Sequence, residues 1–381
     1  MNYRKLGKSG ILVSEIALGC AAFHGLTQDE TGAFLDYAIG NGINCMDMYT
    51  PDPDIHARIG AYLRGRREKL VVQAHFCTAW RDGQYVVVRG LDDVRKSFEL
   101  MLDNSRLGFV DVGMIHYVDS METWRQLIDN GVVDYALRCR EECLIRAFGI
   151  SSHNPDVARQ LIHQGVEVLM FSINPCYDLM PSSVDIYAMA ERSSYEGSAL
   201  CLDPSRQGLY EECLQLGVGI TVMKTFAGGS LLDVRKSPVD RTLTPVQCIH
   251  YALTRPAVSC IMAGARSREE LDACLAYETA AEADRDYAVA FADFPRIDWS
   301  GRCLYCGHCA PCPKHIDVAM VTKLLNLTIA QNGAAETERG HYAALDAHAG
   351  DCIGCGACEK RCPFSVPVMK NMRLAAQTFG L

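Results

Sequence analysis

The sequence predicts an α/β protein: a closed (β/α)8 TIM barrel of parallel strands, followed by a small helical C-terminal domain. Short apolar runs rich in β-branched residues alternate with longer amphipathic stretches through the first 285 residues. This alternation is typical of βα units, and eight such units account for a barrel of this length. An open doubly wound sheet is the alternative, but it requires a glycine-rich phosphate turn after the first strand, where this chain has GCAAFHG.

The expected strands are short and mostly apolar. They span residues 14–20, 42–47, 69–76, 110–117, 145–152, 167–174, 217–224 and 258–264. Helices are expected between them, for example at 31–42, 91–105 and 154–165, where apolar residues recur with helical spacing. Several of these segments end in Gly or Asn-Gly, which favours a left-handed helix cap.

The 19 cysteines are unevenly distributed, because eight of them fall in two short runs near the C-terminus. Each run places three cysteines at three-residue steps, followed by a fourth cysteine and a proline. The runs are Cys303, Cys306, Cys309 and Cys312, and then Cys352, Cys355, Cys358 and Cys362. In two-cluster ferredoxins the fourth cysteine of a run binds the other cluster. The pattern predicts two 4Fe–4S clusters, whereas zinc, which prefers separated pairs of ligands, fits it poorly.

The cysteine runs indicate a second domain. We expect a barrel over residues 1–285 and a ferredoxin-type iron–sulfur domain over 286–381, with helices at 316–333 and 336–348 between the two runs. Two neighbouring clusters exchange electrons readily, so this domain is expected to relay electrons. A purely structural role for the clusters is the alternative, because bound metal also supplies folding energy.

Composition and charge exclude several classes of function. The net charge of −9 argues against binding to nucleic acid. No apolar run reaches membrane-spanning length, and the N-terminal MNYRKLGKSG lacks the apolar core of a signal peptide. Metal-binding cysteines belong to a reducing compartment, and exposed 4Fe–4S clusters are sensitive to oxygen, so we expect an anaerobic cytoplasm.

Polar side chains stand at the C-terminal ends of the expected strands. In chain order they are Asp47, His75, His116, Ser151, Ser152, His153, Asn174 and Lys224. The C-terminal ends of barrel strands meet at one rim, where barrel enzymes place their active sites. A succession of polar groups on this rim predicts one common pocket. Further candidates for its lining are Phe23, His24, Trp80, Tyr117 and Tyr177, although ordinary core packing explains these equally well.

These residues, in this order, resemble the aldo-keto reductases, and the cysteine runs narrow the resemblance to their ferredoxin-bearing branch. The resemblance covers essentially all 381 residues and is carried by YRKLGKSGILVSEIALGC, GINCMD, VDVGMIHY, RAFGISSHNPD, VMKTFAGGSLL and IMAGARSREELDACL. It implies an oxidoreductase with a TIM barrel and with a nicotinamide cofactor bound at the C-terminal rim.

The catalytic group of this family contains an Asp, a Tyr, a Lys and a His. Asp47 and His116 match two of these positions, but His75 stands at the position of the lysine. The tyrosine position, five residues after the aspartate, holds Asp52, and Tyr49 is the only nearby tyrosine. The implied catalytic residues are therefore Asp47, Tyr49, His75 and His116. Their proton relay departs from that of the family, because a histidine is a cation only when it is protonated.

The resemblance also implies a groove for the nicotinamide cofactor. Its expected contacts are Ser151, Ser152, Asn174, Lys224, Gly228, Gly264, Arg266 and Ser267. Three positions depart from the family: Met170 replaces a glutamine under the nicotinamide, Cys274 replaces an asparagine that contacts the adenine, and Glu270 stands where an arginine often holds the 2′-phosphate. A carboxylate at position 270 repels a phosphate, so we expect NADH to bind at least as well as NADPH, with Arg266 as the residue that could reverse this preference.

Three functions are consistent with these features. The first is the reduction of a small organic substrate, of carbonyl type or related, with electrons from NADH or NADPH, from the clusters, or from both. The second is metal-assisted redox chemistry at a site formed by Asp47, His75, His116 and His153, because imidazoles and a carboxylate are suitable metal ligands. The third is a non-enzymatic electron carrier or redox sensor.

An electron-carrier protein is the expected partner besides the small-molecule substrate. A basic group formed by Lys360, Arg361, Lys370 and Arg373 follows the second cysteine run and could dock an acidic electron donor such as a ferredoxin or a flavodoxin. More often such a group is only a solvated surface. Neither a nucleic acid nor a membrane is expected as a partner.

Overall fold

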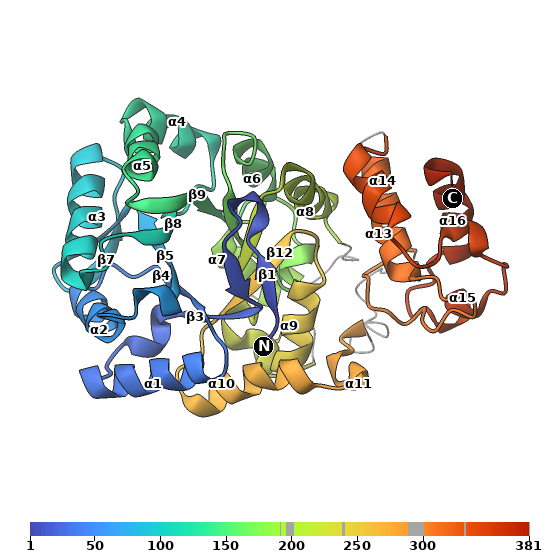
Figure 1. Ribbon diagram of the computed structural model, residues 1–381, viewed down its shortest axis with the longest axis horizontal. Coiled ribbons are helices and arrows are strands. Elements are labelled where there is room, and N and C mark those ends of the chain that lie inside the picture. The colour runs from blue at the N-terminus through green and yellow to red at the C-terminus, as the bar shows by residue number, and fades with distance from the viewer. Residues whose placement is uncertain (191, 196–201, 238–240, 289–300, 331–332, 381) are drawn as a thin grey trace.

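The computed structural model describes residues 1–190, 192–195, 202–237, 241–288, 301–330 and 333–380. Figure 1 shows a larger part, coloured blue to orange, and a smaller helical part, coloured orange to red. In the larger part, eight parallel strands close into a barrel. They are β3 (Ile16–Gly19), β4 (Cys45–Met48), β5 (Val71–Phe76), β8 (Val110–Ile115), β9 (Ile145–Ser152), β10 (Val168–Ser172), β11 (Gly219–Met223) and β12 (Val258–Ala263). The predicted fold class is confirmed.

Helices surround the barrel. They are α1 (Gln28–Gly40), α2 (Pro53–Leu63), α3 (Leu91–Ser105), α4 (Met121–Asp129), α5 (Val132–Glu141), α6 (Pro155–Leu161), α7 (Ile186–Ala190), α8 (Pro204–Leu216), α9 (Pro245–Leu253), α10 (Arg268–Leu275) and α11 (Glu282–Arg285). The predicted helix at 91–105 coincides with α3. Helix α1 begins three residues earlier than expected, because Thr27 and Glu30 form a capping box at its N-terminus.

Two layers of apolar side chains form the core of the barrel. Alternate strand residues point outward to the helices or inward to the lumen, as the two-residue period of a strand requires. The lumen is closed at one end by a hairpin of β1 (Tyr3–Lys5) and β2 (Leu12–Ser14), whose neighbours Leu6 and Ile11 are buried there. Gly7 lets this hairpin approach the barrel, since a Cβ at that position would lie 2.2 Å from the backbone nitrogen of Gly219.

The C-terminal part is helical, as predicted. It contains α13 (Val318–Ala330), α14 (Glu336–Ala343), α15 (Ala357–Arg361) and α16 (Val368–Phe379), and α13 packs against both α14 and α16. The end of the helix expected at 316–333 includes residues outside the described ranges. The boundary at 285/286 stays a prediction, because residues 289–300 are not among those described. In the described ranges, no helix combines the length and apolarity needed to cross a membrane.

Asp111 joins three segments at the N-terminal end of β8. Its buried carboxylate accepts hydrogen bonds from Arg67 and Arg146, both at 2.7 Å, and from the backbone N–H of Val72 at 2.8 Å. We expect Asp111→Asn to lower the free energy of unfolding by about 2–4 kcal/mol, because a buried acceptor of charged donors is weakened. Urea denaturation of the anaerobic protein measures this loss.

The matched control for Asp111→Asn is Asp93→Asn. Asp93 pairs with Arg81, and both side chains are about half exposed. Water screens such a pair, so its loss is expected to cost less than about 1 kcal/mol. Equal losses in the two variants would contradict the structural role assigned to Asp111.

Candidate active site

A chain of hydrogen bonds crosses the C-terminal mouth of the barrel. Asp47, in β4, accepts a hydrogen bond from Nε2 of His75, in β5, at 2.8 Å. The Nδ1 atoms of His75 and His116 are 2.8 Å apart, and Nε2 of His116 lies 2.7 Å from the hydroxyl of Tyr85. The structure thus brings together three of the four candidate catalytic residues and joins them to a tyrosine that the sequence analysis missed.

The carboxylate at one end sets the direction of every hydrogen bond in this chain. A carboxylate only accepts, so the His75 ring carries its proton on Nε2 and offers a bare Nδ1 to the next ring. His116 then donates from Nδ1, and its bare Nε2 accepts from the Tyr85 hydroxyl. One added proton on the histidine pair reverses the last bond. His116 then donates to the Tyr85 oxygen, and the hydroxyl hydrogen of Tyr85 is free to face a substrate.

Burial controls the protonation of this chain. The pKa of His116 lies well below the usual value of a histidine. Burial is the largest cause, and the charge of His75 is the next. Burial also raises the pKa of Tyr85 to about 12, so its hydroxyl keeps its proton at neutral pH. The Gln73 amide fixes the far end, because it donates to Asp47 at 2.7 Å and accepts from Thr221 at 3.2 Å.

Tyr85 comes from a hairpin inserted after β5, formed by β6 (Thr78–Arg81) and β7 (Gln84–Val87). Asp82 and Gly83 form its turn, with φ values of 50° and 73°. An Asp-Gly pair between apolar strands is a strong hairpin signal and could have revealed this element in the sequence. Across the hairpin Tyr85 pairs with Trp80, which lines a separate groove of about 260 Å³. That Trp80 also lines the pocket at the barrel mouth stays a prediction.

Tyr49 does not join the chain of hydrogen bonds. Within the described ranges its hydroxyl has no hydrogen-bond partner, although it lies close enough to Asp47 to feel the charge of that carboxylate. Burial, followed by the charges of Cys20 and Asp47, raises the pKa of Tyr49 to about 12. A catalytic role for Tyr49 stays a prediction, and the contacts of its hydroxyl give it less support than those of Tyr85.

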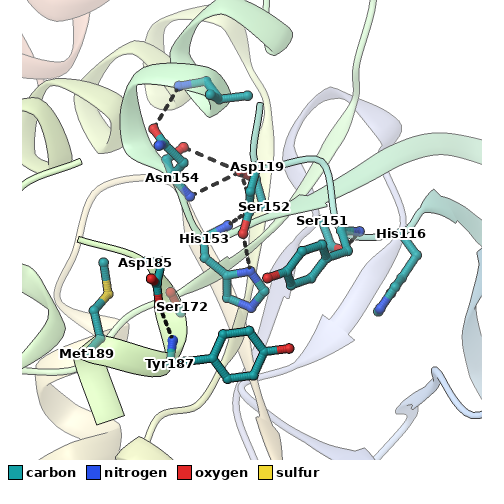
Figure 2. Close-up of polar contacts among 12 residues, drawn as sticks. His116, Asp119, Ser151, Ser152, His153, Asn154, Ser172, Asp185, Tyr187 and Met189 are labelled. Carbon is teal, nitrogen blue, oxygen red and sulfur yellow. Dashed lines mark hydrogen bonds and ion pairs between the residues drawn. The ribbon is translucent and has the colours of Figure 1, made fainter. Parts of the chain in front are cut away.

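A second polar group surrounds Asp119, which the sequence analysis also missed. Its carboxylate accepts from the Ser152 hydroxyl at 3.1 Å and from the His153 backbone at 2.7 Å, and it lies 3.0 Å from Nδ1 of His153 (Figure 2). Burial alone would raise the pKa of Asp119, but the His153 contacts and the Ser152 hydroxyl bring it below its usual value. Figure 2 shows the His153 ring between this group and the exposed ring of Tyr187.

The predicted four-residue metal site is not assembled in this geometry. His153 is paired with Asp119, and both ring nitrogens of His75 already contact Asp47 and His116. Across the part of the chain that is described, no three His, Cys, Asp or Glu side chains are grouped so as to hold a metal ion. The mouth of the barrel is therefore better suited to moving a proton than to binding a metal.

A cavity of about 680 Å³ lies beside this mouth. It is lined by Lys224, Thr225, Phe226, Gly228, Gly229, Leu232, Pro245, Met262, Gly264, Ala265, Arg266, Glu269, Glu270, Ala273 and Cys274. Four of the eight predicted cofactor contacts are among these residues. The others have local partners: Ser267 caps α10, Ser151 accepts from Tyr117, Ser152 donates to Asp119, and Asn174 donates to the carbonyl of Lys224.

One end of this cavity suits phosphate groups. Gly228 and Gly229 have φ values of 67° and 92°, and a Cβ at either would meet nothing within 4 Å, so a ligand can approach the backbone closely. Among the described residues the buried hydroxyl of Thr225 has no hydrogen-bond partner, and Lys224 supplies a cation whose pKa is lowered by burial. These residues fit the pyrophosphate of a dinucleotide.

The other end of the cavity is acidic. Glu269 and Glu270 line it, and Glu270 accepts a hydrogen bond from the backbone N–H of Arg266 at 2.7 Å. A carboxylate held in this way repels an additional phosphate. Arg266 lines the cavity beside these two carboxylates, so this part of the cavity presents charges of both signs.

The eight cysteines of the two runs line two small cavities in the C-terminal part. One cavity is lined by Cys303, Cys306, Cys309 and Cys362, and the other by Cys312, Cys352, Cys355 and Cys358. The fourth cysteine of each run thus lines a cavity together with the first three cysteines of the other run, as the spacing predicts. Four thiols around each cavity are the donor set that a 4Fe–4S cluster requires.

The hydrogen-bond directions at the barrel mouth predict fixed tautomers. We expect His75 to carry its proton on Nε2 and His116 on Nδ1, and we expect His116 to stay neutral as the pH falls from 8 to 6.5. Nitrogen-15 NMR of the histidine rings measures both properties, and Tyr85→Phe should change the signal of His116 Nε2. A His116 ring that takes up a proton at or above pH 6.5 would contradict the arrangement.

Comparison with known proteins relates both parts of the chain to described groups. The model of a 4Fe-4S dicluster domain matches residues 302–367. A curated protein of Bacillus subtilis (strain 168), the uncharacterized oxidoreductase YqkF, is 24% identical over 288 residues, which cover 71% of this chain and 89% of that protein.

Solved structures of aldo-keto reductases superpose on the barrel. The holo form of AKR11C1 from Bacillus halodurans is 20% identical, with a TM-score of 0.57 over 75% of this chain and 94% of that one. The inferred aldo-keto reductase PA4992 from Pseudomonas aeruginosa is 21% identical, with a TM-score of 0.55 over 72% and 93%. This chain therefore has the barrel fold of the aldo-keto reductases, joined to a 4Fe-4S dicluster domain at residues 302–367.

Proposed function

We propose that this chain is an iron–sulfur oxidoreductase that reduces a small organic substrate of carbonyl type at the barrel mouth. Its electrons would come from NADH or NADPH, from two 4Fe–4S clusters, or from both. The fold, the phosphate-binding end of the large cavity and the two sets of four cysteines support this proposal. The observation that carries it is the hydrogen-bonded chain Tyr85–His116–His75–Asp47.

This chain suits a carbonyl reduction because it ends on a hydroxyl that can lose a proton. Two electrons and two protons convert a carbonyl to an alcohol, and the oxygen takes one of these protons as charge develops on it. When the histidine pair holds an extra proton, His116 donates to the Tyr85 oxygen and the Tyr85 hydrogen can pass to the substrate. When the pair is neutral, Tyr85 donates to His116, and its oxygen can accept a proton from an alcohol.

The electron sources differ in the chemistry that they supply. A bound nicotinamide would supply a hydride, which is two electrons and one proton, to the substrate carbon. Two clusters together would supply two single electrons, and the proton on the substrate carbon would then come from solvent. In both cases Asp47 would orient the histidine pair through its hydrogen bond with His75, and Gln73 would hold Asp47 in place.

Electrons from a carrier protein would enter at the more exposed of the two cysteine cavities. Cys355 is exposed there, and its neighbour Ile353 is 61% exposed. The basic group expected at this surface includes Arg361, whose guanidinium instead donates to the backbone carbonyls of Cys309 and Pro311. A ferredoxin or flavodoxin donor therefore stays a proposal that rests on exposure more than on charge.

The role of Tyr85 is tested by comparing two tyrosine variants. Tyr85→Phe is expected to lower kcat for reduction by about 10²–10³-fold, because it removes the proton donor alone. Tyr49→Phe should have a much smaller effect. The assay is anaerobic, NADH-dependent reduction of a panel of aliphatic and aromatic aldehydes and ketones, at equal iron content. A larger loss of kcat in Tyr49→Phe than in Tyr85→Phe would contradict this role and would make Tyr49, the tyrosine expected from the sequence, the proton donor.

The pH dependence of the same reaction has a definite sign. The pKa of His116 lies below the usual histidine value, so the protonated pair that turns Tyr85 into an acid forms only as the pH falls below 6.5. We expect kcat for carbonyl reduction to rise as the pH is lowered from 7.5 towards 5.5, and Tyr85→Phe to abolish this rise. A wild-type profile that falls over this range would contradict the proposed relay.

The acidic end of the large cavity predicts the choice of nucleotide. Calorimetry of the anaerobic protein is expected to give a Kd for NADH that equals or is lower than the Kd for NADPH. Glu270→Gln removes the repulsive charge and should strengthen NADPH binding several-fold while leaving NADH binding nearly unchanged. Tighter binding of NADPH by the unaltered protein would overturn this assignment, and binding of neither nucleotide would leave the clusters as the electron source.

A further inference from the structure

A fully buried arginine lies between the barrel and the C-terminal part. Arg255, after α9, is 1% exposed, and every oxygen that it contacts is neutral. Its Nη2 donates to the backbone carbonyl of Leu304 at 2.5 Å, to the hydroxyl of Tyr287 at 3.0 Å and to that of Thr254 at 3.1 Å. Its Nε donates to the carbonyl of Tyr251 at 3.2 Å, and its Nη1 has no hydrogen-bond partner in the part of the chain that the structure describes.

Arg255 has no carboxylate to itself, because Asp178, whose charge acts on Arg255, accepts the hydroxyl of Tyr251 and is shared with a second buried arginine. Among the described residues, no Asp or Glu forms an ion pair with Arg255. The other fully buried arginine of the barrel, Arg206, has the carboxylate of Asp178 at 4.0 Å. Burying a cation without a counter-ion is strongly unfavourable, so an arginine retained in such a place requires a negative charge from elsewhere.

A second cation increases this imbalance. Lys323, in α13 of the C-terminal part, is largely buried nearby. Burial, and next the charge of Arg255, lower the pKa of Lys323 to about 8. Two positive groups from the two parts of the chain therefore repel each other at their junction, where Asp178 acts on Arg255, and Asp317 and Glu211 act on Lys323.

The missing negative charge lies on the other side of Leu304. This residue stands between Cys303 and Cys306, and it lines the cavity of Cys303, Cys306, Cys309 and Cys362. Tyr287 donates to the same Leu304 carbonyl at 2.7 Å, and its hydroxyl is close enough to Cys303 and Cys306 to feel their charges. A 4Fe–4S cluster with four thiolate ligands carries a net negative charge, which grows by one unit on one-electron reduction.

We propose that the 4Fe–4S cluster held by Cys303, Cys306, Cys309 and Cys362 is the counter-ion of Arg255, and that Arg255 raises the reduction potential of this cluster. A fixed positive charge at its edge stabilises the more negative, reduced form. Arg255 acts as a positioning residue, because it contacts the loop between two ligands and not the cluster itself. This proposal requires that the cluster binds, but it does not require the carbonyl reduction proposed for the barrel mouth. An experiment can therefore disprove one of the two proposals without disproving the other.

The consequence is a preferred direction for electrons. The cluster beside Arg255 borders the barrel, whereas the cysteines of the other cavity include the exposed Cys355. An electron donated by a low-potential carrier at the exposed cluster is then drawn toward the barrel. From Arg255 the contacts continue inward, since its guanidinium lies 4.3 Å from the centre of the Tyr251 ring, and the Tyr251 hydroxyl donates to Asp178 at 2.7 Å.

Redox titration with dithionite, followed by EPR of the anaerobic holoprotein, tests the proposal. Arg255→Gln removes the charge and is expected to lower the potential of one cluster while leaving the other unchanged. Arg255→Lys restores the charge and should recover much of the shift. Tyr287→Phe is the matched control, because it removes a neutral hydrogen bond to Leu304 and keeps the charge, so it should shift the potential less than Arg255→Gln does.

Two results would overturn the proposal. One is an unchanged pair of potentials in Arg255→Gln, and the other is an equal shift of both clusters. If Arg255→Gln fails to assemble its full iron content, Arg255→Met, which also removes the charge, decides the question. A lower potential of one cluster is then expected, and an unchanged potential in that variant refutes the role.

Discussion

The carboxylate of Asp47 is the constraint on which the candidate active site depends. It can only accept hydrogen bonds, so it fixes the tautomer of His75 and, through that ring, the tautomer of His116. Parallel strand pairing makes this possible, because Asp47 pairs with Gln73 and His75 pairs with Met114 on adjacent strands. Asp47 and the pairing register of the barrel strands therefore set the direction of every hydrogen bond in the chain up to Tyr85.

The histidine at the lysine position changes what such a site can do. A buried lysine would hold a permanent positive charge next to the tyrosine, whereas two coupled imidazoles hold one only when a proton is added. Burial keeps His116 neutral under ordinary conditions. The Tyr85 hydroxyl then becomes an acid or a base according to the protonation of the pair, so one site can serve either direction of a carbonyl–alcohol conversion.

The junction between the two parts of the chain is electrostatic as well as apolar. Apolar side chains of both parts belong to one continuous core, and Arg255 crosses the junction to reach the carbonyl of Leu304. Because Arg255 shares one buried carboxylate, Asp178, with Arg206, negative charge from the second part would stabilise the junction. If the cluster balances the charge of Arg255, as proposed, then assembly of the cluster also stabilises the docking of the C-terminal part onto the barrel.

Local features made the fold and part of the site predictable. The alternation of apolar runs predicts the barrel, and the spacing of cysteines predicts which four thiols face each cavity, because both depend on short-range geometry. Strand-end position alone indicated Asp47, His75 and His116. The grouping of His153 with these residues failed, because a loop brings Asp119 to its ring instead.

The sequence by itself therefore determined the barrel, the cysteine sets and the rim on which the polar residues stand. Tertiary structure decided which side chains touch. Tyr85 reaches His116 across 31 positions of sequence only because a hairpin folds back over the barrel mouth, and Arg255 meets Leu304 across 49 positions. Such contacts depend on the paths of loops and on the docking of one part against another. Neither leaves a period or a spacing in the sequence from which it could be predicted.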